Sequence, residues 1–393
     1  MSHILLTANT AWYMANFRSS MIRKLTDQGH RVSVMVPDGM GLNRLRKLGC
    51  DIHILRLKAT SKNPISDLIL LFRFLVFFAR LKPDAVLSFT IKNNIYGSLA
   101  ARILGIPILP NITGLGAAFA SQNWLARTVG FLSKSAFRGL PMVFFQNEED
   151  RNFFAKLGIV QLHRSHRLPG SGVDLNHFHA PPPRMRRETV FILVARLLRD
   201  KGVKDFVRAA RILKFQRIPV ECRILGFLDD THKNSIDAKE LEAWVEEGII
   251  DYFGSTDDVR PYLRDADCVV LPSKYREGVP RSLLEGAAMG RGLITTDMPG
   301  CRDTIDSGVS GIVVEPGNPI QLANAMRDFA MIGPIGRRVV GQQAREKVER
   351  EFDEELVLTA YMSWLSQTLS GHTPQPSLGK RIKFGSKLDV PRA

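Results

Sequence analysis

The chain has 393 residues, which is more than one hydrophobic core usually supports, so two domains are expected. Its 45% hydrophobic and 24% charged residues are ordinary for a globular protein, and its four cysteines include no C-x-x-C pair, which argues against a disulfide framework or a zinc site. The net charge of +15 lies in the first half: residues 1–187 hold 25 Lys and Arg against 9 Asp and Glu, and the remainder holds 29 against 30.

A basic excess of this kind attracts nucleic acid, anionic lipid headgroups or a diphosphate. The sequence contains no helix-turn-helix, zinc-finger or ribonucleoprotein motif, so nucleic acid is not the expected partner. Residues 1–6 lack the basic and apolar regions of a signal peptide. We therefore expect a cytoplasmic protein whose first half faces an anionic surface or ligand.

In chain order, the first half alternates short apolar runs with helical periods, which is the pattern of a parallel sheet with crossover helices. Strands are predicted at 3–8, 31–36, 51–55, 85–89, 107–112 and 142–146, and helices at 17–28 and 95–104.

Segment 65–81 is unusually apolar, but Asp67, Arg73 and Arg80 interrupt it. No uncharged run reaches the ~18 residues that a membrane span requires. Two interpretations remain open. The segment is either a buried crossover helix or a helix partly inserted in the membrane interface, flanked by Lys62, Lys82 and Lys92.

Three prolines at 181–183 stiffen the chain and mark a linker before the second half. The second half repeats the α/β pattern, with strands predicted at 189–194, 222–225, 250–253, 268–271, 293–296 and 312–314, and helices at 203–214, 319–331, 337–352 and 354–369. The predicted division is a first domain at 1–180, a second at 189–352, a helix at 353–370 and a disordered basic tail at 371–393.

The most informative stretch is 275–285, where Glu277 and Glu285 stand eight residues apart around a predicted helix start. Pro280 fits the first helical turn, and the N–H groups of Ser282 and Leu283 then face whatever anion lies above the helix end. Carboxylates suit the hydroxyl groups of a sugar or ribose. The combination suits a nucleotide-sugar, with Gly278 and Val279 bringing backbone close to the sugar.

A second basic element follows the predicted strand at 189–194, where Arg196 and Lys201 could neutralise a diphosphate leaving group. Gly226 and Ser255 follow two further strands of the same half; they either border the base of the nucleotide or merely end those strands.

The first half has weaker motifs at the corresponding strand ends. Lys92 and Asn93 follow the strand at 85–89; they either meet an acceptor or form a strand-to-helix turn with Asn as N-cap. Thr113 and Gly114 follow the strand at 107–112, where glycine allows a close approach to a ligand. The D-x-D sequence at 265–267 precedes a buried strand and is expected to end a helix, not to bind a metal.

These motifs resemble a known family. The string at 273–291, SKYREGVPRSLLEGAAMGR, is similar to the E-x7-E signature of retaining family 4 glycosyltransferases, and 195–202, ARLLRDKG, resembles their G-R-x-x-x-x-K-G element with Ala195 in place of glycine. The stretches around Asn16 and Arg18 and at 90–97 resemble bacterial members that extend undecaprenyl-diphosphate-linked sugars.

The resemblance implies a GT-B fold: two Rossmann-like α/β domains with parallel sheets facing a cleft, and a last helix that crosses back to the first domain. It implies a metal-independent, retaining transferase without a cofactor. Glu277, Arg196 and Lys201 would be catalytic. Donor binding would fall to Glu285, Gly278, Val279, Pro280, Ser282, Leu283, Gly226 and Ser255, and acceptor binding to Asn16, Arg18, Lys92, Asn93, Thr113 and Gly114.

The implied reaction moves a hexose or N-acetylhexosamine from a UDP-sugar to a polyprenyl-diphosphate-linked saccharide at the cytoplasmic face of the bacterial inner membrane. The product would serve lipopolysaccharide, capsule or exopolysaccharide synthesis. Two alternatives remain: a GT-B-fold UDP-N-acetylglucosamine epimerase, and a basic lipid-binding protein without catalysis.

Overall fold

Short runs of aliphatic residues form two separate parallel β-sheets in the computed structural model, which describes residues 1–57, 63–114, 124–182, 188–229 and 232–372. The first sheet has seven strands in the order β3-β2-β1-β4-β5-β6-β7. Its strands are β1 His3–Thr7, β2 Arg31–Val36, β3 Asp51–Ile54, β4 Ala85–Phe89, β5 Ile108–Ile112, β6 Val143–Phe145 and β7 Ser165–Arg167.

Helices follow the strands of the first sheet, as crossover connections in a parallel sheet require. They are α1 Ala11–Phe17, α2 Ser19–Asp27, α3 Leu42–Arg46, α4 Pro64–Leu81, α5 Ile91–Leu104, α6 Trp124–Phe137 and α7 Glu148–Lys156, with a short turn η2 Leu162–Arg164.

The second sheet has six strands in the order β10-β9-β8-β11-β12-β13. The strands are β8 Thr189–Val194, β9 Val220–Leu225, β10 Asp251–Tyr252, β11 Cys268–Leu271, β12 Gly292–Thr296 and β13 Gly311–Val314. The connecting elements are η3 Arg199–Lys201, α8 Val203–Phe215, α9 Ala238–Glu246, α10 Arg260–Arg264, α11 Arg281–Ala288, η4 Arg302–Thr304 and α12 Pro319–Met331.

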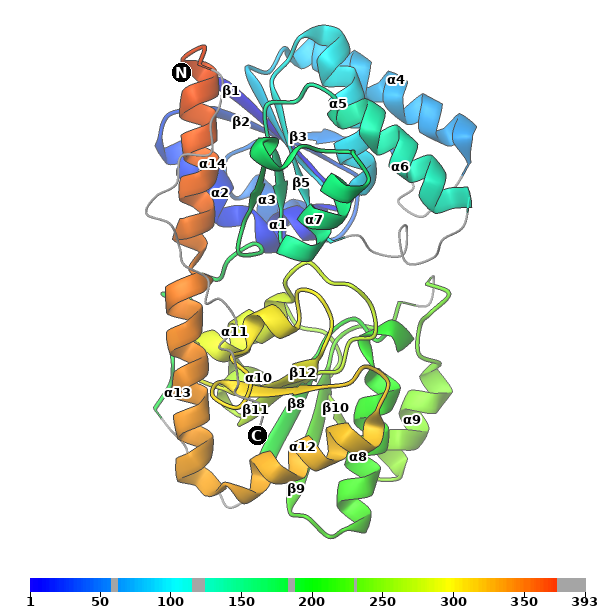
Figure 1. Ribbon diagram of the computed structural model, residues 1–393, viewed down its shortest axis with the longest axis vertical. Helices are drawn as coiled ribbons and strands as arrows, with labels where there is room; N and C mark the ends of the chain where they lie inside the picture. The colour runs from blue at the N-terminus through cyan, green and yellow to red at the C-terminus, as the bar shows by residue number, and fades with distance from the viewer. Residues whose placement is uncertain (58–62, 115–123, 183–187, 230–231, 373–393) are drawn as a thin grey trace.

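Two long helices close the chain and run end to end along one side of the molecule (Figure 1). The first, α13 Gly333–Glu351, packs against the second sheet's domain, and the second, α14 Glu354–Leu369, packs against the first. Tyr361 and Trp364 of α14 belong to the core cluster that covers β1 and β2, and the Tyr361 hydroxyl accepts a hydrogen bond from Asn111 Nδ2 at 2.5 Å. The predicted return of the last helix to the first domain is confirmed.

The α/β pattern read from the sequence is confirmed, and β8 and β11 have the predicted bounds. The helix predicted at 17–28 is present as the shorter α2 Ser19–Asp27. The prediction missed the helix before it, α1, which Thr10 caps and which ends at Phe17, so that Arg18 separates the two helices. Residues 373–393, most of the predicted tail, and Lys62 lie outside the described residues.

The apolar segment 65–81 lies in helix α4, which packs one side on the first sheet, as a crossover helix does; its insertion in a membrane interface stays a prediction. Leu70, Phe74 and Phe78 are buried against the sheet, whereas Leu68 and Phe72 are 67% and 65% exposed. Within the part of the chain that the structure describes, no helix combines the length and hydrophobicity needed to cross a bilayer.

The strand orders locate the functional edges. In each sheet the order reverses beside the first strand, between β1 and β4 in one and between β8 and β11 in the other. In open parallel sheets, ligands bind at the carboxyl ends of strands at this switch point.

Candidate functional site

The switch point of the second sheet brings together two loops that are distant in sequence. Arg196 and Lys201 follow β8, and Glu277 follows β11, which pairs directly with β8. Lys201 Nζ donates to Glu277 Oε1 at 2.5 Å, and Ser273 Oγ donates to the same oxygen at 2.9 Å. The predicted cation and carboxylate are therefore in contact, at the edge where a parallel sheet binds ligands.

Tyr275 lies beside this ion pair. The Lys201 ammonium lies 5.0 Å from the centre of the Tyr275 ring. Burial alone would lower the pKa of Lys201, but attraction to Glu277 and Tyr275 outweighs burial and raises the pKa above its usual value. Lys201 is therefore a permanent cation at neutral pH.

Arg196 is the more accessible cation. Its side chain is nearly half-exposed, its nearest acidic partner is Asp229 at 3.9 Å, and its charge acts on the Tyr275 hydroxyl. Long arginine side chains with exposed guanidinium groups are suited to bidentate contact with a phosphate.

The start of α11 lies between the two predicted glutamates. Pro280 is the N-cap, with φ −65° and ψ 120°, and not a residue of the first turn as predicted, so the helix begins one residue later at Arg281. Ser282 and Leu283 remain in the first turn, and no side chain caps this helix end. Its N–H groups are thus available to an anion.

Glu285 lies one turn into α11 and pairs with Arg281. Arg281 Nε donates to Glu285 Oε1 at 3.0 Å, and both side chains are largely buried. Burial raises the pKa of the Glu285 carboxyl, and Arg281 offsets part of this rise. The four predicted charged residues thus form two groups: Arg196, Lys201 and Glu277 around Tyr275, and Glu285 with Arg281 on the adjoining helix.

The loop that carries Glu277 is pressed against the first domain. A Cβ on Gly278 would lie 2.1 Å from Gln146 Oε1 and 2.5 Å from the Thr113 carbonyl oxygen, so no larger residue fits without movement. Gly114, with φ +119°, faces Gly278 in turn: a Cβ there would lie 2.8 Å from the Gly278 nitrogen. The predicted residues Thr113 and Gly114 therefore contact the loop that carries Glu277.

Hydrogen bonds between the domains hold the same loop. Arg276 donates to the buried carboxylate of Asp150 at 2.9 Å, and Asn147 Nδ2 donates to the Glu277 carbonyl at 3.1 Å. The Val279 N–H donates to Gln146 Oε1 at 3.3 Å. These contacts fix the backbone on both sides of Glu277 from the opposite domain.

Gly226 and Ser255 follow β9 and β10. The Gly226 N–H donates to the Gly254 carbonyl at 2.7 Å, and the Tyr252 hydroxyl donates to the Gly226 carbonyl at 2.9 Å. Ser255 is exposed. These bonds join the two strand ends into one rim near Arg196, since the Ala195 N–H also bonds to the end of β9.

The residues predicted for acceptor binding are not brought to one place. Arg18 is only 1% exposed, with its guanidinium 4.3 Å from the centre of the Phe89 ring and bonded to the Tyr13 hydroxyl. Asn93 is fully buried and donates to Thr7 Oγ1 at 2.7 Å. Direct contact of Arg18 or Asn93 with an acceptor does not fit this packing, because neither side chain reaches solvent.

Lys92 pairs with Asp67 of α4 at 2.5 Å and is mostly buried. The turn before it is strained: Thr90, the N-cap of α5, has φ 70° and ψ 150°, a conformation that glycine usually occupies. Asn93 is therefore not the predicted N-cap. Such strain is typical of functional loops, and this one lies at the switch point of the first sheet.

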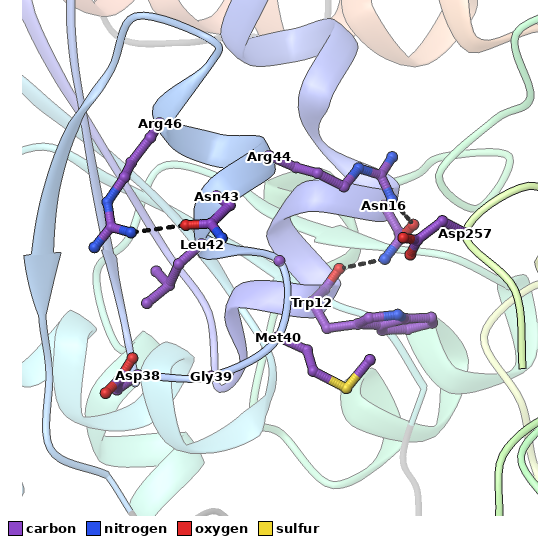
Figure 2. A pocket seen from close by; sticks show the side chains of 11 residues that line it. Trp12, Asn16, Asp38, Gly39, Met40, Leu42, Asn43, Arg44, Arg46 and Asp257 are labelled. Carbon is purple, nitrogen blue, oxygen red and sulfur yellow. Dashed lines mark hydrogen bonds between the residues drawn. The ribbon is translucent and has the colours of Figure 1, made fainter.

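Asn16 lines a pocket of about 470 Å³ between α1 and the loop that leads into α3 (Figure 2). Its Nδ2 donates to the Trp12 carbonyl at 2.9 Å, and its Oδ1 accepts from Arg44 at 2.8 Å. Asp257 of the second domain lines the same pocket.

Sequence reasoning missed several residues around the site. Arg281 could have been found, because its spacing of four from Glu285 predicts an ion pair on a helix. Tyr275, Arg276 and Asp150 gave no local signal, since their contacts depend on the folded loops. Among the described residues, no group of three or more His, Cys, Asp or Glu side chains could hold a metal ion.

Comparisons with known protein families cover both halves of the chain. Residues 188–330 match the family model described as glycosyl transferases group 1, and residues 3–147 match the model described as glycosyl transferase 4-like. The first of these matches contains all six strands of the second sheet, and the other contains β1–β6 of the first.

One similar protein is the N,N'-diacetylbacillosaminyl-diphospho-undecaprenol alpha-1,3-N-acetylgalactosaminyltransferase of Campylobacter jejuni, 26% identical over 88% of this chain and 94% of that protein. Another is the putative colanic acid biosynthesis glycosyltransferase WcaL of Escherichia coli, 30% identical over 47% of each chain.

Among solved structures, HepE of Anabaena in complex with UDP and glucose superposes with a TM-score of 0.77 at 16% identity, over 93% of this chain and all of that one. A glycosyltransferase of Rickettsia africae superposes with a TM-score of 0.72 at 17% identity, over 94% and 98% of the two chains. These likenesses confirm the predicted fold.

Proposed function

Because the chain is a GT-B glycosyltransferase with a group 1 domain and a 4-like domain, we propose that it moves a hexose or N-acetylhexosamine from a UDP-sugar to a polyprenyl-diphosphate-linked saccharide. One observation carries the donor assignment: the Lys201–Glu277 pair lies beside an uncapped helix start. We assign residues 189–352 to donor binding and residues 1–180 to the acceptor and the membrane.

In this proposal the diphosphate of the donor lies over the first turn of α11, bonded to the N–H groups of Ser282 and Leu283 and to Lys201 and Arg196. Glu277 accepts hydrogen bonds from hydroxyl groups of the donor sugar, and Glu285 accepts hydrogen bonds from the hydroxyl groups of the ribose. Fixed donors aimed at the charge that develops on the leaving group are worth about 3–4 kcal/mol each when water is excluded.

The reaction retains the configuration of the anomeric carbon. The bond from this carbon to the β-phosphate oxygen breaks, and the acceptor oxygen bonds to it from the same face. The acceptor proton passes to the departing phosphate, so no protein nucleophile, metal ion or cofactor is needed. The contacts of Arg276 and Asn147 hold the Glu277 loop in place during this step.

The acceptor class is supported by the activity for which the Campylobacter relative is named: that protein acts on a diphospho-undecaprenol-linked sugar and matches this chain over most of its length. Several partial relatives are named for extracellular polysaccharides, including colanic acid and capsule. We therefore place the product in bacterial surface polysaccharide or glycan synthesis.

A membrane surface fits one face of the first domain, where α4, α5 and α6 lie side by side (Figure 1). Exposed apolar side chains on this face include Leu68 and Phe72 of α4 and Phe131 of α6. The three helices carry six Lys and Arg against one acidic residue, Asp67. Apolar insertion combined with cationic attraction favours the interface of an anionic leaflet, so we propose peripheral association with the inner membrane.

The test is a donor panel of UDP-GalNAc, UDP-GlcNAc, UDP-Gal and UDP-Glc, incubated with undecaprenyl-diphosphate-linked N-acetylhexosamine and followed by mass spectrometry. We expect UDP release that depends on the lipid and a lipid product heavier by one sugar. Isomerisation of the donor without the lipid would instead indicate an epimerase. Absence of any UDP release would leave a binding protein.

A further inference from the structure

The pocket between α1 and the β2–α3 loop is lined by none of the residues assigned to donor binding, yet it has the dimensions of a ligand site. Its volume of about 470 Å³ lies within the roughly 300–1,000 Å³ typical of small-molecule sites. Its walls come from both domains, because Asp257 of the second domain lines it together with Trp12 and Asn16 of the first (Figure 2).

Two exposed apolar side chains lie at this pocket. The Trp12 indole is 37% exposed and Met40 is 68% exposed, although large apolar side chains are normally buried. An exposed indole offers a rigid, flat surface on which the C–H face of a sugar ring can lie.

The polar lining is mixed and balanced in charge. Arg44 and Arg46 carry positive charges, and Asp38 and Asp257 carry negative ones, so the net charge cancels. Within the described residues none of these four side chains belongs to an ion pair; Arg44 donates to Asn16, and Arg46 to Asn43. A neutral polyol can use both kinds of group, since each hydroxyl both donates and accepts, whereas a diphosphate only accepts and leaves the two carboxylates unused.

The pocket adjoins the donor site through a short series of contacts. The Trp12 ring packs edge-on against Phe17 at 5.4 Å, and the Arg281 guanidinium lies 5.7 Å from the centre of the Phe17 ring. Arg281 is the first residue of α11 and pairs with Glu285. A sugar on Trp12 would therefore lie close to the helix start to which the donor diphosphate is assigned.

The backbone holds the pocket open before any ligand arrives. Gly41 has φ +98°, and a Cβ at this position would lie 2.9 Å from the Ala11 carbonyl oxygen. Glycine thus lets the loop that carries Asp38 and Met40 rest directly on α1, and a preformed site loses little free energy in ordering when it binds.

We propose that this pocket binds the saccharide of the lipid-linked acceptor, with Trp12 as the stacking surface for an uncharged sugar ring and Arg44, Asn16 and Asp257 as its hydrogen-bonding partners. This inference rests on the proposed function and adds a specificity determinant to it. The lipid and the diphosphate bind elsewhere on the first domain.

The test measures binding without a donor, using undecaprenyl-diphosphate-linked N-acetylhexosamine and undecaprenyl diphosphate without a sugar, each in nanodiscs. The wild-type chain should bind the glycosylated lipid more tightly. Trp12→Ala should weaken binding of the glycosylated lipid about tenfold and leave binding of the bare lipid unchanged, since an aromatic stacking contact contributes roughly one factor of ten. Trp12→Phe should restore part of the loss, and Phe215→Ala, an exposed aromatic on α8, should change neither affinity.

Equal binding of both lipids by the wild-type chain would overturn the proposal, as would equal weakening of both by Trp12→Ala, which would assign the pocket to the diphosphate or the lipid chain. In the transfer assay the acceptor KM should rise in Trp12→Ala. A wild-type chain that prefers the glycosylated lipid but releases no UDP would contradict the proposed function and leave the pocket assignment standing.

Discussion

The switch points of the two sheets occupy corresponding places but carry different chemistry. In the second sheet, an ion pair, Lys201–Glu277, lies beside a helix start with free N–H groups. In the first sheet, the corresponding edge contains neutral hydrogen bonds, such as Asn93 to Thr7, and its two cations are not available to a ligand: Lys92 is paired with Asp67, and Arg18 is buried. We infer from this difference that the second half holds a charged leaving group, whereas the first recognises its ligand through apolar surfaces and a pocket whose charges cancel.

Removal of either member of the Lys201–Glu277 pair should have the largest effect. Lys201→Ala and Glu277→Gln should each lower kcat by about 10²- to 10³-fold in the UDP-release assay, because each removes a fixed charge at the developing diphosphate or sugar. The matched control is Glu247→Gln, which breaks the exposed Arg211–Glu247 pair at 2.7 Å and should leave kcat unchanged. Wild-type activity in either site variant would place the chemistry outside this pair.

The contact between the halves is tested by Gly278→Ala. The added methyl group meets Gln146 and Thr113 of the first domain, so the donor loop must move and kcat should fall by roughly 10²-fold, as expected for a displacement of about 1 Å. Small-angle scattering should show a larger radius of gyration. Gly130→Ala, where a Cβ meets nothing within 4 Å, is the control and should behave as the wild type; a fully active Gly278→Ala variant would mean that the halves need not approach this closely.

The outer face of the first half is tested by the double variant Leu68→Glu/Phe72→Glu. Both side chains are exposed, so folding should be unaffected, but loss of their insertion should reduce partitioning onto phosphatidylglycerol vesicles by about tenfold or more. Phe215→Glu makes the same change on the second half and should not alter co-sedimentation. Unchanged partitioning of the double variant would exclude α4 as the membrane contact.

The smallest effect is expected from Glu285→Gln, which keeps the hydrogen-bonding shape but removes the charge. Donor kcat/KM should fall about fivefold at neutral pH, since a charge-assisted bond is roughly twice as strong as a neutral one. Burial raises the pKa of Glu285 above 4.5, so the wild-type donor KM should increase as pH falls through that raised pKa, and the variant should lack this dependence.

Because the pKa of Glu285 is raised by folding, the folded state binds the proton of this carboxyl more tightly than the unfolded state does. The stability contribution of Glu285 is therefore greatest below pH 4.5 and is lost as pH rises through the raised pKa. Thermal melts across this range should show a shallower loss of stability in Glu285→Gln. Identical pH profiles for the two proteins would contradict the burial of this carboxyl.

The donor half could be predicted in detail from the sequence because its signals are local. Glu277, Glu285 and the helix start lie within one short stretch, and Lys201 follows a strand that pairs with the strand before that stretch. The rule that ligands meet parallel strands at their carboxyl ends was then enough to predict that cation and carboxylate would meet.

The acceptor half could not be predicted in this way. Nothing local indicates that Arg18 is buried among aromatic rings, since arginine is usually exposed. The Arg276–Asp150 bond joins residues 126 positions apart, and the pocket at Trp12 requires a loop from each domain. Such contacts depend on how two folded domains pack against each other.

The most direct measurement is a crystal structure of the chain with UDP. We expect the β-phosphate to lie within hydrogen-bonding distance of the Ser282 or Leu283 N–H and of Lys201 Nζ, with the ribose hydroxyls on Glu285. UDP bound in the first domain, or on the second with its phosphates away from the start of α11, would contradict the proposed donor site.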